Sequence, residues 1–275
     1  MLGGTRRGGS RSFGKSRIII ALIFVGFSFV SYLSSKEYNP VTGENQYISL
    51  TPKQEIALGL QAAPKMIQQH GGLYPDQKYQ EMVDNIGNSL VKNSKAGETV
   101  YQYDFHLLDD RRSINAFALP GGQIFITAAL FSKLKTEAQL AGVLGHEIAH
   151  VVARHSAQQM AKSNLTKGIL NGVLVASDPS GGSAQAATYL GELVNMKFGR
   201  DDELESDKLG IRFMVKSGYD PNAMVGVMKI LAEAGGGGDQ PEFFSTHPNP
   251  ANRVAEIRRA IQELYPNGLP GGLKN

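Results

Sequence analysis

The stretch His146-Glu147-Ile148-Ala149-His150 is the feature from which the fold and the chemistry of this chain can be worked out. A helix places two histidines four residues apart on one face, where both rings can bind a single metal ion. Glu147 lies beside them, and its carboxylate can accept a proton from a water molecule at that metal. The five residues therefore predict a metal site and a general base in little more than one helical turn.

Apolar residues flank this stretch on both sides. They are Leu140, Val143 and Leu144 before it and Val151 and Val152 after it. We therefore expect a core helix, and a His-Glu-His group is costly to bury without partners. The alternative is an ordinary helix with surface histidines. Thr136 and Gln139 fit a capping box, so we expect this helix to begin there and to continue to about residue 160.

A second segment, residues 200–210, reads RDDELESDKLG and supplies carboxylates for a third ligand. Glu203 and Asp207 share a helix face, so one can bind the metal while the other orients a ligating histidine. Glu205 points elsewhere on the helix. Two histidines and a carboxylate are a common ligand set for zinc, although another first-row ion is compatible with them. The alternative is a charged helix face exposed to solvent.

Four motifs in this order resemble peptidase family M48, a gluzincin family, and its bacterial periplasmic, Oma-like branch. They are NAFALPGG (115–122), HEIAHVVARHS (146–156), RDDELESDKLG (200–210) and STHP (245–248), followed by Arg253. The resemblance covers about residues 40–264. Gly199 and Ser206 differ from the Ser and Ala that members of the family often carry, but both changes are small and leave the ligand positions intact.

The resemblance implies a zinc metalloendopeptidase with one Zn²⁺ per chain. Its ligands would be His146, His150 and Glu203, with Glu147 as the general base and Asp207 supporting a ligand. His247 would approach the zinc, either as a plug in a resting state or as a catalytic group that stabilises the oxyanion. The alternative is a structural histidine of a loop.

Three further positions are assigned more loosely. Asn115 and Ala116 are expected on an edge strand, to which an extended peptide substrate could add as another strand; the alternative is a plain core strand. His155 lies five residues beyond His150, off the ligand face of a continuous helix, and we expect it to be structural.

The fold class expected is α+β and mostly helical: a gluzincin-type metalloprotease domain with a small antiparallel sheet, behind one N-terminal transmembrane helix. The sheet is predicted from residues 100–107, 114–119 and 123–127, where apolar residues and the turn Pro120-Gly121-Gly122 suggest strands. Besides the central helix, helices are predicted near 52–69, 76–94, 184–217 and 250–264.

Residues 18–35 carry no charge, and as a helix they would span roughly 27 Å, close to the thickness of the hydrocarbon layer. Five basic residues and no acidic residue precede them. The positive-inside rule then predicts an inner-membrane, single-pass anchor with the catalytic domain in the periplasm. The alternatives are a cleaved signal peptide with a secreted periplasmic enzyme, a mitochondrial presequence or inner-membrane enzyme, and a buried soluble helix.

The organisation expected along the chain follows from these segments. It comprises a basic cytoplasmic tail (1–17), the signal-anchor helix (18–35), a linker (36–50), the metallopeptidase domain (51–265) and a flexible tail (266–275).

Charge and cysteine content exclude several classes. The chain has 275 residues with 28 basic and 25 acidic side chains, but the 23 basic and 25 acidic residues from position 18 onward leave a net charge of −2. We therefore expect no nucleic-acid partner. The absence of cysteine excludes disulfides, a thiolate metal site, a cysteine nucleophile and a lipidated cysteine.

The function predicted is that of a membrane-anchored zinc-dependent endopeptidase that hydrolyses misfolded or envelope proteins. Its partners would be protein or peptide substrates and the membrane, and the oligomeric state stays open. Two alternatives are a latent or chaperone-like protein that retains the fold and a zinc hydrolase that acts on a non-peptide amide.

Overall fold

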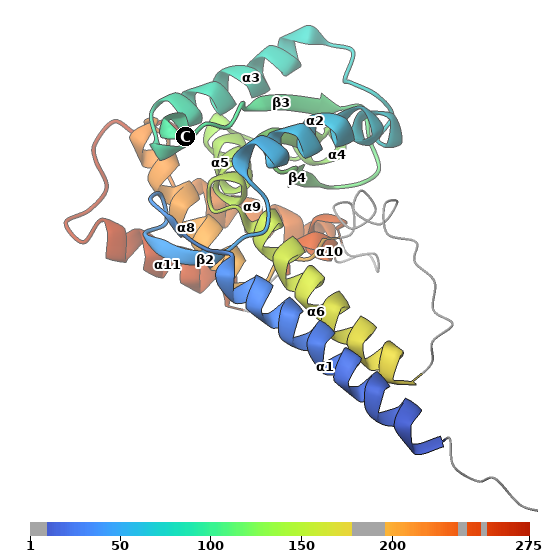
Figure 1. Cartoon of the computed structure of the whole chain (residues 1–275). Coiled ribbons are helices and arrows are strands. Elements are labelled where there is room, and N and C mark those ends of the chain that lie inside the picture. The colour runs from blue at the N-terminus through green and yellow to red at the C-terminus, as the bar shows by residue number, and fades with distance from the viewer. Residues whose placement is uncertain (1–9, 178–195, 236–240, 249–251) are drawn as a thin grey trace, which may run out of the picture.

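Helices make up most of the fold, and small sheets cover one side of a central helix, which confirms the fold class expected (Figure 1). The structure is a computed structural model that describes residues 10–177, 196–235, 241–248 and 252–275. The helices are α1 (Ser10–Ser34), α2 (Pro52–Gln69), α3 (Gln77–Lys92), the 3₁₀ helix η1 (Lys95–Glu98), α4 (Ala128–Phe131), α5 (Glu137–Val152), α6 (His155–Ser177), α8 (Arg200–Lys216), α9 (Ala223–Ala234), α10 (Phe243–Thr246) and α11 (Arg253–Leu264). The strands are β1 (Lys36–Asn39), β2 (Glu44–Tyr47), β3 (Asp104–Leu108), β4 (Ala116–Ala118) and β5 (Gln123–Thr127).

The larger sheet has the strand order β3-β5-β4 and is mixed. Strand β4 runs antiparallel to β5, as expected, but β3 runs parallel to β5, so the prediction of a purely antiparallel sheet is wrong for that pair. The chain reverses direction twice between β3 and β5, and β5 then inserts between the two earlier strands. Strand β4 is left at the edge of the sheet.

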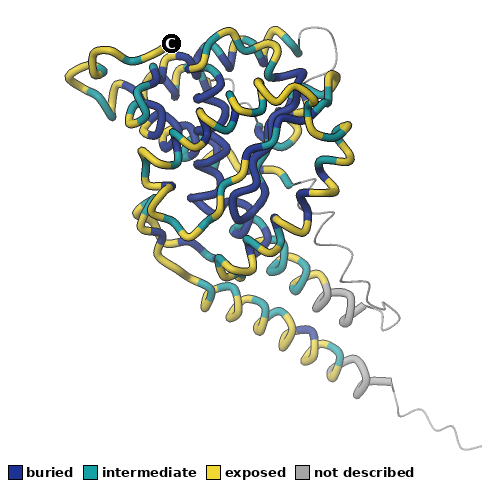
Figure 2. Tube along the Cα trace, turned by 90° about the horizontal axis from the view of Figure 1, so that it is seen from above, coloured by how far each residue is buried: buried dark blue, intermediate teal, exposed yellow. Residues whose placement is uncertain are grey.

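Helix α5 is the centre of the core. It contacts α3, α8, α9 and two strands of the larger sheet, and nearly every residue along it is buried (Figure 2). Its N-terminus is capped by Thr136, whose side chain accepts a hydrogen bond from the Gln139 amide. Gly145 of α5 faces Gly210 of α8, and a Cβ atom at Gly210 would lie 3.3 Å from the Gly145 carbonyl carbon. The two small residues let the helices cross closely, which brings the carboxylates of α8 to the histidines of α5.

The expected continuous helix to residue 160 is broken between α5 and α6. Arg154 at the break has φ of 57°, a left-handed conformation that costs roughly 1–3 kcal/mol in a residue other than glycine. Its buried guanidinium donates to the Glu55 carboxylate at 2.6 and 2.9 Å and to the Leu50 carbonyl at 2.7 Å. These contacts hold the strained turn in place, and α6 leaves in a new direction.

The segment expected to be a linker contains the hairpin β1-β2, which is fixed to the end of α5. Asn39 Nδ2 donates to the Val152 carbonyl at 2.7 Å, and Gln46 Nε2 donates to the Ala153 carbonyl at 2.8 Å. Carbonyls at a helix C-terminus lack partners within the helix, so two buried amide side chains satisfy them here. The chain that follows α1 is thereby attached to the helix that carries the histidines.

Two other expectations are modified near the C-terminal half. The helix predicted over 184–217 begins only at Arg200 within the described residues: residues 196–199 are not helical, and residues 184–195 lie outside the described part. The tail expected to be loose pairs with the domain, because the amide of Asp220 donates to the Lys274 carbonyl and the amide of Lys274 donates to the Gly218 carbonyl, both at 2.8 Å.

Among the described residues, one helix is long and apolar enough to cross a membrane, and it comprises Ser16–Ser34 of α1. It projects from the domain, and α6 lies beside it for much of its length (Figures 1 and 2).

Candidate metal centre

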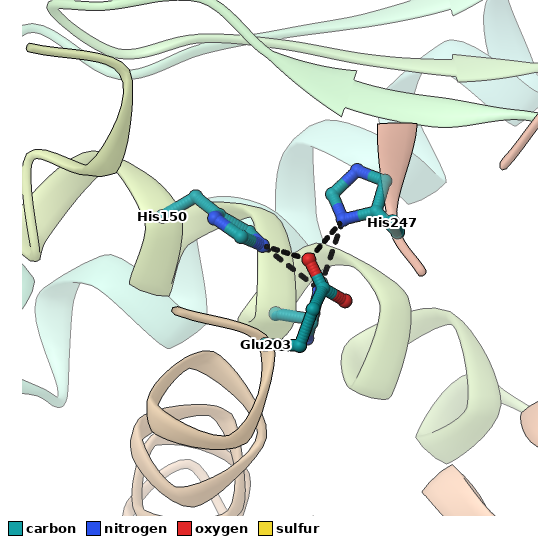
Figure 3. Close-up of side chains that lie close together, drawn as sticks. His150, Glu203 and His247 are labelled. Atoms are coloured by element: carbon teal, nitrogen blue, oxygen red, sulfur yellow. Dashed lines mark hydrogen bonds and ion pairs between the residues drawn. The ribbon is translucent and has the colours of Figure 1, made fainter. Parts of the chain in front are cut away.

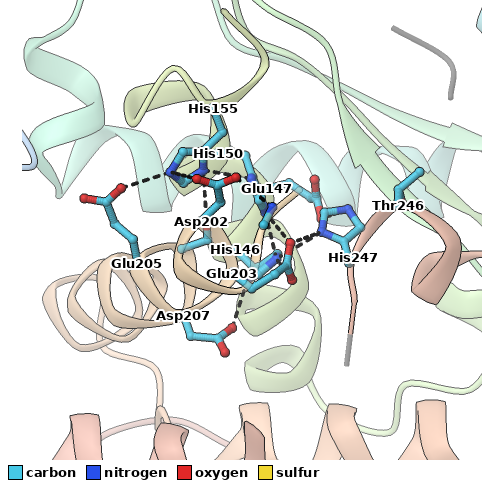
Figure 4. Close-up of polar contacts among 12 residues, drawn as sticks. His146, Glu147, His150, His155, Asp202, Glu203, Glu205, Asp207, Thr246 and His247 are labelled. Atoms are coloured by element: carbon cyan, nitrogen blue, oxygen red, sulfur yellow. Dashed lines mark hydrogen bonds and ion pairs between the residues drawn. The ribbon is translucent and has the colours of Figure 1, made fainter. Parts of the chain in front are cut away.

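Four buried side chains from three parts of the chain meet at one point. His146 and His150 come from α5, Glu203 comes from α8, and His247 directly follows α10 (Figures 3 and 4). One donor atom from each lies within 4.8 Å of the others. The Nε2 atoms of His146 and His150 are 3.0 Å apart, and the Glu203 carboxylate lies 3.5 Å from the first and 3.4 Å from the second. The structure thus brings together all three ligands implied by the resemblance.

These donors fit a zinc ion. Imidazole nitrogens and a carboxylate oxygen converge in a buried site, and this is the donor chemistry of catalytic zinc centres. Two ring nitrogens 3.0 Å apart repel each other unless a proton or a cation lies between them. The group as a whole is therefore better explained as a metal site than as a set of ordinary hydrogen bonds.

Asp207 orients the first histidine. Its Oδ1 accepts a hydrogen bond from His146 Nδ1 at 3.0 Å, which leaves Nε2 to face the other donors (Figure 4). Burial lowers the pKa of His146, but Asp207 and Glu203 outweigh burial and raise this pKa to about 9. The supporting role expected of Asp207 agrees with this contact.

Arg253 is a partner that the sequence analysis did not assign. Its guanidinium is 1% exposed and pairs with Glu203 Oε2 at 2.8 Å, while its Nε and Nη2 donate to the two Asp207 oxygens at 2.9 Å. Burial opposes ionisation of Glu203, yet His247, the ligand histidines and this cation keep the carboxylate charged, and its pKa lies well below the usual range. The only sequence signal for the pairing of Arg253 with these carboxylates was its position shortly after the last of the four family motifs.

Glu147 lies in the centre without a hydrogen-bond partner among the described residues. Both of its carboxylate oxygens are buried, and Oε1 lies 3.7 Å from His247 Nε2. Burial raises the pKa of Glu147, while His247 and His146 act in the opposite direction. A carboxylate with a raised pKa and unused lone pairs is suited to accept a proton from a reactant.

His155 lies outside the donor group, in keeping with the structural role expected of it, but it contacts the second histidine, which the assumption of a continuous helix did not predict. The break at Arg154 turns its ring back, so that His155 Nδ1 lies 2.9 Å from His150 Nδ1 (Figure 4). On its other side, His155 Nε2 lies 2.9 Å from Glu205 Oε2. Glu205 does point away from the ligands, as expected, but its carboxylate contacts His155, which in turn contacts His150. A helical wheel could not reveal this contact because the helix is interrupted.

Replacement of His155 by Ala should therefore weaken metal binding. Loss of a residue that orients a ligand typically lowers metal affinity about 10–100-fold. Competition with a chelator of known affinity, followed by metal analysis, measures the change. Lys162→Ala, at an exposed position of the same helix, is the matched control and should bind zinc as the parent does. Equal affinities for His155→Ala and the control would contradict this role.

The residues expected to meet the substrate border the centre. Asn115 directly precedes the edge strand β4, Ala116 begins it, and a pocket beside them is lined by Asn115, Phe117, Ala118 and His247. The side-chain oxygen of Asn115 is buried without a hydrogen-bond partner in the described part of the chain. An acceptor of this kind is available to a molecule that enters the pocket.

The fold and the site together define a metallopeptidase of the gluzincin class: a buried helix carries His-Glu-His, and a second helix presents a carboxylate to it. The chain belongs to peptidase family M48, whose family model matches residues 77–261.

Curated relatives agree with this assignment. The chain is 30% identical to the Beta-barrel assembly-enhancing protease of Escherichia coli (strain K12) over 257 residues, which is 90% of this chain and 52% of the relative. It is 28% identical to the Mitochondrial metalloendopeptidase OMA1 of Schizosaccharomyces pombe over 240 residues, 85% of this chain and 69% of the relative. The chain spans about half the length of the first of these relatives.

Proposed function

We propose that this chain is a membrane-anchored, zinc-dependent endopeptidase. His146, His150 and Glu203 hold the metal, and Glu147 is the general base. The observation that carries the proposal is the buried, unpartnered Glu147 carboxylate beside a convergent set of metal donors. A chain that kept the fold only as a scaffold would have no use for this arrangement, which disfavours the chaperone-like alternative.

The chemistry divides between the metal and the side chains. Zinc, when bound, supplies a Lewis acid that polarises a peptide carbonyl and lowers the pKa of water. Glu147 accepts a proton from the attacking water and passes it to the leaving amine. Asp207 and Arg253 keep His146 and Glu203 in place, and the closed packing around α5 excludes other water.

An extended polypeptide is the substrate class that fits best. Strand β4 is an edge, so a peptide can add to it through main-chain hydrogen bonds, with the Asn115 amide beside it. We assign Asn115 and Ala116 to this binding edge. Misfolded or envelope proteins are the substrates we propose; the name of the bacterial relative, which refers to beta-barrel assembly, supports envelope proteins.

His247 acts as a plug in the resting enzyme. Its Nδ1 lies 3.0 Å from Glu203 Oε1 and 3.4 Å from His146 Nε2, within the donor group itself. Its ring stacks on Phe243 with centroids 4.4 Å apart, which favours this inward position. A side chain that occupies a position next to the ligands competes with water and substrate for the open coordination position.

His247→Ala should consequently raise the basal rate of cleavage, because it opens that position. Initial rates on an unfolded protein, with zinc content measured in parallel, test the expectation. Ser245→Ala changes an exposed side chain of α10, the short helix that directly precedes His247, and should leave the rate unchanged. A lower rate in His247→Ala with full zinc content would instead identify His247 as a catalytic donor to the oxyanion.

We propose that α1 anchors the protein in the inner membrane as a single span, with its basic N-terminal tail in the cytoplasm and the catalytic domain in the periplasm. The uncharged stretch of α1 and the five preceding cations support this orientation. Protease accessibility in spheroplasts tests it: the domain should be digested from the periplasmic side.

The proposed activity is tested with the detergent-solubilised full chain and casein as an unfolded substrate. Cleavage should stop on addition of a chelator and return when zinc is restored. Zinc bound at one ion per chain with no cleavage, even in His247→Ala, would contradict the proposal. Cleavage that survives complete removal of metal would contradict it as well.

A further inference from the structure

Helix α6 connects the candidate metal centre to the apolar helix α1. At its N-terminus His155 contacts the metal ligand His150, and farther along it packs against α1, the helix that is apolar enough to cross a membrane (Figure 1). We infer that the outer half of α6 is itself embedded in the lipid bilayer, beside α1. This inference rests on the anchoring role proposed for α1.

The α1 side of the contact is a stripe of partly or fully buried residues in an otherwise exposed helix. The stripe comprises Arg17, Ala21, Val25, Ser28 and Tyr32, at spacings of three and four residues. Such spacing places them on one face of the helix. The other faces remain apolar and exposed, with Phe27 at 74% exposure. Helix α1 thus offers one face to α6 and the remainder to lipid.

The two helices approach each other through small side chains. A Cβ atom added at Gly168 of α6 would lie 2.0 Å from Ser28 Oγ of α1, so only glycine allows this approach. Close contact through Gly, Ala and Ser is how helices associate inside membranes, where apolar burial alone does not favour association. The contact therefore has the character of a membrane-embedded helix pair.

The depth of the contact follows from helix geometry. Ser28 lies six residues inside the end of α1 at Ser34, which corresponds to roughly 9 Å along the helix. Gly168, which faces Ser28, must lie at a similar depth if α1 spans the bilayer. Helix α6 continues beyond Gly168 to Ser177, and residues 169–176 read ILNGVLVA without a charge. Leu170 is 55% exposed, which lipid would explain.

An α-helix can enter lipid without leaving backbone groups unpaired, because its backbone hydrogen bonds are made within the helix. Lys162 of α6 is exposed and lies about 9 Å nearer the domain than Gly168. Lys167, the last charged residue of α6, directly precedes Gly168 and marks the boundary, since a long lysine side chain can extend toward the lipid headgroups. The helix that enters the bilayer begins at the histidine that supports a metal ligand. The catalytic centre is therefore held at the membrane surface, where segments of membrane-associated proteins are within reach.

The composition of the chain makes this testable, because it contains no tryptophan. Single-tryptophan variants of the full chain are reconstituted in phosphatidylcholine/phosphatidylglycerol vesicles with and without brominated acyl chains, which quench tryptophan in the hydrocarbon layer. Leu170→Trp is the test position, and Phe27→Trp reports on the anchor. Lys162→Trp, nearer the domain on α6, and Val100→Trp, exposed in the catalytic domain, are controls.

We expect Leu170→Trp to lose fluorescence to the same extent as Phe27→Trp, Lys162→Trp to lose less, and Val100→Trp to lose none. Quenching of Phe27→Trp without quenching of Leu170→Trp would overturn the inference while leaving the anchor intact. No quenching at Phe27→Trp would overturn the anchor and the inference together. Casein cleavage by each variant verifies that the substitution leaves the catalytic domain folded. Cleavage thus tests the proposed activity, while quenching tests the position of α6 relative to the membrane.

Discussion

Glu147→Gln is expected to abolish peptide hydrolysis while the protein keeps its zinc. General-base catalysis contributes about 10²–10⁴-fold to a rate, and the amide of Gln cannot accept the proton. Gln has nearly the volume of Glu, and the Glu147 oxygens have no hydrogen-bond partner among the described residues that could be lost. Metal content and thermal stability should therefore stay close to those of the parent. Rates on casein, with zinc measured in the same samples, give the result.

Glu137→Gln is the matched control for this prediction. It makes the same chemical change on the same helix at an exposed position, one residue after the N-cap. Its rate should equal that of the parent. Turnover of Glu147→Gln at the parental rate would exclude Glu147 as the base. Loss of zinc from Glu147→Gln would instead assign it a role in holding the metal.

Arg253→Met is expected to lower stability more than any other single change we consider outside the ligands. The substitution removes a buried cation and leaves the Glu203 and Asp207 carboxylates with histidine partners only. Breaking one side of a buried ion pair typically costs about 3–5 kcal/mol. For a domain of this size that corresponds to a fall in melting temperature of roughly 6–20 °C. Thermal unfolding of the purified protein, followed by circular dichroism, measures it.

Zinc affinity should fall in the same variant, because Arg253 fixes one ligand directly and a second through Asp207. Arg258→Met, at an exposed position of the same helix, is the control and should change neither quantity. An unchanged melting temperature in Arg253→Met would mean that the carboxylates are satisfied in another way. A fall in stability with unaltered zinc affinity would limit Arg253 to a structural role.

Local sequence patterns sufficed for the helix that carries the chemistry. A four-residue spacing fixes two histidines on one face whatever surrounds the helix, and the apolar residues around them already required burial. The same reasoning located the helix from Pro52, with its capping Thr51 and first-turn proline, and the uncharged run of α1. In these cases the information lies within one or two turns of the chain.

The direction of a strand and the end of a helix depended on partners far away in sequence. Strand β5 lies between β3 and β4 and pairs in parallel with β3. The alternation of polar and apolar residues along a strand encodes neither this position nor the direction of pairing. Helix α5 ends where Glu55, about a hundred residues earlier, binds Arg154 in a strained conformation. The residues of the expected linker supply the amides that cap the same helix end.

The sequence by itself therefore predicted the candidate ligands, the candidate base and the uncharged helix. Spacing within a helix and composition indicated the histidine pair and the uncharged helix, and the resemblance to the family assigned Glu203 and the role of Glu147. Only the tertiary structure decided what surrounds them. Arg253 reaches Glu203, His155 turns back to His150, His247 enters the donor group and α6 runs beside α1. These contacts join segments separated by a loop, a break or most of the chain, and they form because buried charges and helix ends must find partners wherever the fold brings them.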